Sequence, residues 1–119
     1  MTEKDSLDQR IRDGLLFDSY GMLLTKRQQR VCEMILSQDL SFSEAGEKLG
    51  VSRQGAHDLV TRARERMEEY ESAFGLVAFG HRLDMMKQSL DENRERLPED
   101  FYSEFRRILE AEVPACLTH

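Results

Sequence analysis

Apolar residues recur at helical spacing through most of the chain, and no segment of useful length alternates between apolar and polar residues. Only two prolines interrupt the pattern. The pattern predicts helices over residues 6–23, 26–37, 42–49, 53–74, 81–96 and 99–111. The expected fold class is therefore all-α.

Local signals mark where the central helices begin and end. Ser41 with Glu44, and Thr25 with Gln28, each form a capping box at a helix start. Gly50 suits the left-handed residue that ends a helix, and Ser52 is a suitable N-cap for the next. A short helix, a glycine turn and a longer helix predict a helix-turn-helix, with an ordinary helical hairpin as the alternative.

The apolar spacing also predicts which side chains are buried. Gly46 lies where the two helices of the motif cross, so a small residue is needed there. The second helix of the motif has a predicted inner face made of Ala56, Leu59, Val60, Ala63 and Met67. The last helix is expected to bury Phe101, Phe105, Ile108 and Leu109.

Length and glycine positions suggest how the chain is divided. A chain of 119 residues suits one compact domain or a small domain with an appendage. Gly75 and Gly80 weaken the helical pattern between the motif and the last two helices. We therefore expect a helix-turn-helix domain at 1–74 and a helical extension at 75–119, which packs on the first part or pairs with a second copy of the chain.

Charge is distributed unevenly along the chain. The formal net charge is −6, but residues 25–67 carry eight basic and six acidic side chains and form the only net basic segment. The acidic remainder is interpreted as a solvated surface, although it would also keep the basic face away from non-specific phosphate.

The residues that carry chemistry are too scattered for a catalytic or metal site. Cys32 and Cys116 lack metal-ligand spacing, and the three histidines have no second ligand or nucleophile near them. No glycine-rich phosphate loop is present. We expect no enzyme activity, no metal and no cofactor. Without a signal peptide or a long apolar span, the chain is expected to be cytoplasmic, with no membrane contact, a buried Cys32 and a free Cys116.

If the motif binds nucleic acid, its second helix presents outward side chains to a groove. The candidates for contact with bases are Arg53, Gln54, His57, Asp58 and Thr61. The candidates for contact with phosphates are Lys26, Arg27, Arg30, Ser52, Arg62 and Arg64. Alternatively, Arg62 and Arg66 form surface ion pairs with acidic neighbours on the same helix. Asp58 opposes tight DNA binding because its charge repels phosphate.

Several of these motifs resemble the YlxM family of small bacterial proteins. The resemblance is carried by Leu16-Phe17, Tyr20, LLT at 23–25 with Gln28, SFSEAGEKLGVSRQGAHD at 41–58, and Arg62, and it covers roughly residues 10–72. It implies a helix-turn-helix like that of sigma factor region four, within the winged-helix-like DNA-binding superfamily. It also implies a role with the RNA and the GTPase protein of the signal recognition particle.

Three functions follow as hypotheses. The resemblance favours an accessory or regulatory protein of the signal recognition particle pathway that binds the particle's RNA, its GTPase protein or both. A sequence-specific regulator that binds duplex DNA is the first alternative. A protein-binding adaptor that uses the apolar helices after Gly75 is the second.

Overall fold

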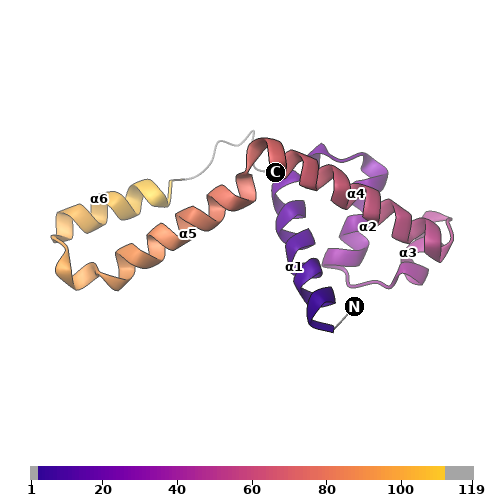
Figure 1. Ribbon diagram of the computed structural model, residues 1–119, viewed down its shortest axis with the longest axis horizontal. Coiled ribbons are helices and arrows are strands. Elements are labelled where there is room, and N and C mark those ends of the chain that lie inside the picture. The colour runs from indigo at the N-terminus through magenta and orange to yellow at the C-terminus, as the bar shows by residue number, and fades with distance from the viewer. Residues whose placement is uncertain (1–2, 112–119) are drawn as a thin grey trace. The chain divides into compact units, whose positions relative to one another are not determined.

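The computed structural model describes residues 3–111, with side chains described from residue 7 onward, and it separates two compact units, Met1–Val77 and Ala78–His119. The first unit holds α1 (Glu3–Tyr20), α2 (Lys26–Cys32), α3 (Phe42–Leu49), α4 (Arg53–Phe74) and the start of α5 (Leu76–Glu92) (Figure 1). The second unit holds the rest of α5 and α6 (Glu99–Leu109). Short helical segments lie between consecutive α-helices: η1 (Gly21–Leu23) after α1, the π-helical η2 (Glu33–Ser37) after α2 and η3 (Arg94–Arg96) after α5. No strand occurs between residues 3 and 111, so the all-α prediction is confirmed.

Both predicted capping boxes are formed. The Ser41 Oγ accepts from the Glu44 N–H at 3.1 Å, and the Glu44 Oε1 accepts from the Ser41 N–H at 2.9 Å. Thr25 and Gln28 exchange the same pair of hydrogen bonds at the start of α2. These bonds satisfy backbone N–H groups that the first turn of a helix leaves without partners. The sequence therefore set the starts of α2 and α3 locally.

α4 is the central helix of the first unit, because α1, α2 and α3 all pack against it. The buried apolar side chains come from every one of these helices, from η2 and, at Leu24, from the segment before α2: Leu16, Tyr20, Leu24, Val31, Cys32, Met34, Ala45, Ala56, Val60, Ala63 and Met67. The inner face predicted for the second helix of the motif is confirmed, with Leu59 partly buried at its edge.

The junction between α4 and α5 is tied to α1 by hydrogen bonds. The Tyr20 hydroxyl donates to Glu71 Oε1 and accepts from the Leu76 N–H at 2.9 Å. Glu71 Oε1 also accepts from the Val77 N–H at 2.9 Å. Burial and the bond to Glu71 raise the pKa of Tyr20, so the hydroxyl stays protonated. The buried tyrosine therefore satisfies the backbone where α5 begins.

Two sequence predictions are corrected here. α5 begins at Leu76 instead of His81 and continues through Gly80, because its first N–H groups have acceptors and one interior glycine costs only about 1 kcal/mol. α6 does not bury Phe101, Phe105 and Ile108, which are 41%, 42% and 58% exposed. Among the helices that the structure describes in the second unit, α5 is the one beside α6, and Tyr102 makes the contact with it.

Two further expectations meet different outcomes. Cys32 is buried as predicted. Cys116 lies outside the described residues. No helix within residues 3–111 is long and apolar enough to cross a membrane.

Candidate nucleic-acid interface

The turn between α3 and α4 is set by three small residues. Gly50 adopts the left-handed conformation, with φ 71° and ψ 33°, and ends α3. The Ser52 Oγ accepts from the Gly55 N–H at 2.9 Å and caps α4. A Cβ atom at Gly46 would lie 2.7 Å from the carbonyl oxygen of Val51, so α3 packs against the backbone of the turn there. The predicted need for a small residue at position 46 is met by this close approach.

The buried face of α4 determines which side chains point outward. Ala56, Val60 and Ala63 lie in the core, so the opposite side of the first turns is exposed. Five of the predicted contact residues on α4 are exposed there: Arg53, Gln54, His57, Asp58 and Arg62. Thr61 is half-buried, and its Oγ1 donates to the His57 carbonyl at 3.0 Å.

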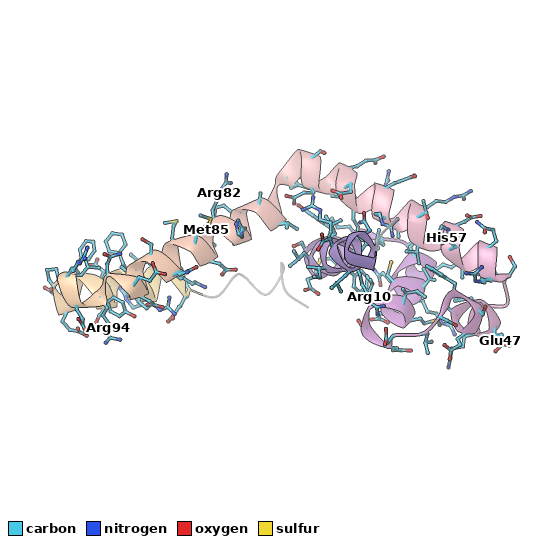
Figure 2. The ribbon with its side chains drawn as sticks, turned by 60° about the horizontal axis from the view of Figure 1, so that its bottom comes forward. Arg10, Glu47, His57, Arg82, Met85 and Arg94 are labelled. Carbon is cyan, nitrogen blue, oxygen red and sulfur yellow. The ribbon has the colours of Figure 1, made fainter. Side chains whose placement is uncertain are left out.

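Neighbouring side chains contact three of these residues. The His57 ring lies edge-on to Phe42 of α3, with ring centroids 5.0 Å apart. Gln54 Nε2 donates to Asp58 Oδ1 at 3.0 Å. Figure 2 shows Glu47 of α3 well apart from His57 of α4. The exposed side of the first half of α4 therefore presents the guanidinium groups of Arg53 and Arg62, the imidazole of His57 and the hydrogen-bonded pair of Gln54 and Asp58.

Basic side chains of the first unit divide into two groups. Four arginines form ion pairs, namely Arg10 with Asp39, Arg12 with Glu68, Arg64 with Asp13 and Arg66 with Glu69. Among the described residues, no carboxylate forms an ion pair with five other predicted contact residues, all exposed: Lys26, Arg27, Arg30, Arg53 and Arg62. These five lie on α2 and the first half of α4. The predicted surface pairing therefore holds for Arg66 and fails for Arg62.

Arg64 is engaged inside the first unit. Its Nε lies 2.9 and 3.0 Å from the two Asp13 carboxylate oxygens, and its Nη2 lies 2.8 Å from Oδ2. Asp13 is 4% exposed and also accepts from Gln9 Nε2 at 2.8 Å. The hydrogen bond to Asp13 raises the pKa of Arg64. In this arrangement Arg64 clamps α1 to α4, whereas the sequence placed it among the phosphate contacts.

The sequence missed this pair because 51 residues separate its members. The buried thiol of Cys32 lies in the same environment: burial first, and the Asp13 charge second, raise the pKa of Cys32 to about 12. Cys32 is therefore a neutral core thiol. Within the part of the chain that the structure describes, no group of three His, Cys, Asp or Glu residues could hold a metal ion.

Comparisons with known proteins agree with the motif. Residues 7–103 match the model of the UPF0122 family, described as "Putative helix-turn-helix protein, YlxM / p13 like". A UPF0122 protein of Symbiobacterium thermophilum is 42% identical over 84 residues, which are 67% of this chain and 78% of the relative. A UPF0122 protein of Thermoanaerobacter sp. (strain X514) is 40% identical over 86 residues, 69% of this chain and 74% of the relative. No solved structure matches the chain.

Proposed function

Because this chain belongs to the UPF0122 family of YlxM-like helix-turn-helix proteins, we propose that it binds nucleic acid through α4 and the basic side chains of α2. The observation that carries the proposal is the division of the basic residues. The arginines of α1 and of the second half of α4 are ion-paired, whereas the basic side chains of α2, α3 and the first half of α4 are exposed without a carboxylate partner within the described residues. Unpaired basic side chains bind phosphate without first breaking an internal ion pair.

The proposed roles differ along α4. Arg53 and Gln54 stand in the first turn, where a recognition helix meets base edges, and both side chains can form bidentate contacts with bases. His57, Asp58 and Thr61 lie next to them on α4 and would face the same groove. The hydrogen bond from Gln54 to Asp58 offsets part of the repulsion between that carboxylate and phosphate. Lys26, Arg27, Arg30 and Arg62 bind phosphates, and the capped helix start at Ser52 adds backbone N–H groups.

We propose further that the protein is a cytoplasmic accessory or regulatory protein of the signal recognition particle pathway, with the particle's RNA, its GTPase protein or both as partners. This part rests on the resemblance of residues 10–72 to the YlxM family, as does the likeness of the motif to sigma factor region four. Any effect on the GTPase would then come from contact between the two proteins.

A DNA-binding regulator is the second candidate, and the geometry of α4 favours it. An exposed first turn that carries Arg53 and Gln54 suits the major groove of B-form DNA. The major groove of A-form RNA is too deep and narrow for side chains to read. Binding to a structured RNA would therefore use loops or the backbone.

The test is direct binding of the purified protein to the particle's RNA, to its GTPase protein and to random duplex DNA over a salt series. Nucleic-acid affinity should fall steeply with salt, because each phosphate contact releases counterions. RNA preferred over duplex DNA supports the particle-associated function, whereas DNA alone supports the regulator. Affinity for the GTPase protein alone, independent of salt, would refute nucleic-acid binding and favour the adaptor.

Two arginines of α4 provide a matched pair of variants. Arg62 forms no ion pair with the residues that the structure describes, whereas Arg66 lies 3.5 Å from Glu69, and both are exposed. Arg62→Ala should weaken binding to all sequences alike and reduce the salt slope by about one. Arg66→Ala should leave the slope unchanged. Equal effects of the two substitutions would contradict the proposed interface.

A further inference from the structure

The second unit has too few neighbouring helices to enclose a core. Residues 78–111 form a helical hairpin in which Tyr102 is the one buried side chain among those that the structure describes. Tyr102 donates to Asp91 at 2.7 Å, and the Arg94 guanidinium covers its ring at 4.4 Å. These polar contacts hold α6 to α5 (Figure 1). An isolated pair of helices needs further apolar contacts to be stable, so the exposed surface of this hairpin is informative.

Five of the six large exposed apolar side chains between residues 78 and 111 lie on one side of the hairpin, and Met85 is the exception. Asp91 of α5 contacts Tyr102 and Arg106 of α6, and the half-buried Gly80, Leu83, Lys87 and Leu90 lie on the same side of α5 as Asp91. On α6, the half-buried Leu109 continues the row of Tyr102 and Arg106. Successive residues of a helix are about 100° apart, so the residues just before these rows fall on the same side of both antiparallel helices. We name this side the apolar flank, made of Phe79, Met86, Phe101, Phe105 and Ile108.

The apolar flank consists of large side chains that are about half exposed. Its five side chains are 53%, 52%, 41%, 42% and 58% exposed in that order, and Phe101 stacks on Phe105 with centroids 4.4 Å apart. Aromatic side chains present about 150–250 Å² each, so the flank leaves on the order of 500 Å² of apolar surface. A patch of this size is at the upper end of what a monomer exposes, and such patches are often functional.

We propose that the apolar flank binds the same flank of a second copy of this chain, so that two hairpins form a four-helix bundle. Two flanks together would bury on the order of 1,000 Å², which is the smallest area expected of a specific interface. A two-fold interface uses the same patch on both copies and closes without leaving apolar surface exposed. The bundle thereby supplies the core that a single hairpin lacks.

The charges at the borders of the flank are consistent with a partner identical to itself. Arg82 lies at its outer border on α5 and Glu104 at its outer border on α6. Neither forms an ion pair with any residue that the structure describes. A two-fold axis parallel to the helices places the α5 border of one copy along the α6 border of the other. Basic and acidic borders then face each other, whereas a strongly charged partner would be repelled by one of them.

The experiment measures the mass of the full chain by sedimentation over a range of protein concentrations, without nucleic acid. The proposal expects a dimer that Ile108→Glu dissociates, with at least a tenfold rise in dissociation constant. Ile108 is already 58% exposed, so this substitution should not unfold the hairpin, and unchanged helical circular dichroism checks this. Phe105→Glu should have the same effect.

Met85 supplies the matched control. It is 56% exposed, projects from α5 near Arg82 (Figure 2) and lies outside the flank, so Met85→Glu should leave the dimer intact. A wild-type chain that stays monomeric at every concentration would overturn the proposal. A dimer that survives both flank substitutions would also overturn it. So would a dimer that is dissociated only by Ile11→Glu, a change at a 55% exposed residue of α1. Because no nucleic acid is present, these outcomes are independent of the proposed function.

Discussion

α4 of the first unit and α6 of the second both repeat apolar residues at helical spacing, yet they bury them differently. On α4, Val60 and Met67 are 5% and 1% exposed, because three other helices surround that face. On α6, Phe105 and Ile108 remain 42% and 58% exposed, because α5 is the one other helix that the structure describes in the second unit. Periodicity therefore identifies an apolar face, and the number of neighbouring helices decides whether the chain itself buries it.

Ion pairs between helices differ between the two units in the same way. Arg64 joins α4 to the buried Asp13 of α1, whose side chain is 6% exposed. Arg106 of α6 lies 3.6 Å from Asp91 of α5 and 2.7 Å from Glu110, whose side chains are 47% and 51% exposed. Removing an arginine leaves a buried carboxylate in the first case and a solvated one in the second. The two units should therefore respond differently to the same substitution.

The largest effect is expected for Arg64→Ala. It leaves Asp13 charged and buried without its partner, and breaking such a pair costs about 3–5 kcal/mol. The free energy of unfolding, measured by urea titration with circular dichroism, should fall by that amount. The measurement should be made at one protein concentration, because a dimer makes stability depend on concentration.

Arg106→Ala is the counterpart in the hairpin. Its exposed carboxylate partners remain hydrated, so the loss should stay below about 1 kcal/mol. Equal losses for the two variants would contradict the distinction between an enclosed and an open unit. Arg62→Ala, which removes no ion pair of the described residues, should leave stability within about 0.5 kcal/mol of the wild type.

Gly46 and Gly80 allow a second comparison, in which substitution by alanine should change the free energy of unfolding in opposite directions. A Cβ atom at Gly46 would lie 2.7 Å from the Val51 carbonyl oxygen and 3.0 Å from that of Ser52, so Gly46→Ala forces the turn backbone to move. Overpacking of this kind costs about 1–3 kcal/mol. A Cβ atom at Gly80 would meet nothing within 4 Å, so Gly80→Ala should stabilise α5 by up to about 1 kcal/mol.

Thermal unfolding of both glycine variants tests these signs. Gly46→Ala should lower the melting temperature, and Gly80→Ala should raise it or leave it unchanged. A harmless Gly46→Ala would show that the turn between α3 and α4 tolerates a side chain at this point. The close packing of the helix-turn-helix would then not depend on glycine.

The features predicted correctly from the sequence depend on residues within a few positions of one another. The capping boxes at Thr25 and Ser41, the turn at Gly50 and the end of α4 at Gly75, which has φ 65°, are all of this kind. Their hydrogen bonds and backbone conformations are decided within four residues, so the sequence alone specifies them.

The features that were missed depend on residues far apart in the chain. Arg64 with Asp13, Arg12 with Glu68 and Tyr20 with Glu71 are 51 to 56 residues apart. Helical periodicity does not show which carboxylate an arginine contacts, so the sequence alone groups Arg64 with the phosphate contacts. Phe101 and Phe105 were expected in the core because their spacing shows an apolar face without showing what covers it.

The smallest effect on the free energy of unfolding is expected at the two capping boxes. One uses the carboxylate of Glu44 and the other the amide of Gln28, so they should respond differently to pH. Glu44 accepts from the Ser41 N–H as a carboxylate, and this bond lowers the pKa of Glu44 below its ordinary value of 4.5. A lowered pKa in the folded state gives stability that is present above the unfolded value and is lost as the pH falls through the folded one. Gln28 makes the same bond with a neutral amide, so the box at Thr25 does not titrate.

Glu44→Gln should therefore make the free energy of unfolding less dependent on pH between about pH 5 and pH 3, and Gln28→Glu should make it more dependent. Urea titrations of both variants and the wild type across that range measure the difference. The wild-type structure is the control for each, because each substitution converts one natural box into the form of the other. If both slopes stayed at the wild-type value, the Glu44 carboxylate would contribute no charge-dependent stability to the start of α3, and the helix-turn-helix would be held at that end by the Ser41 hydroxyl alone.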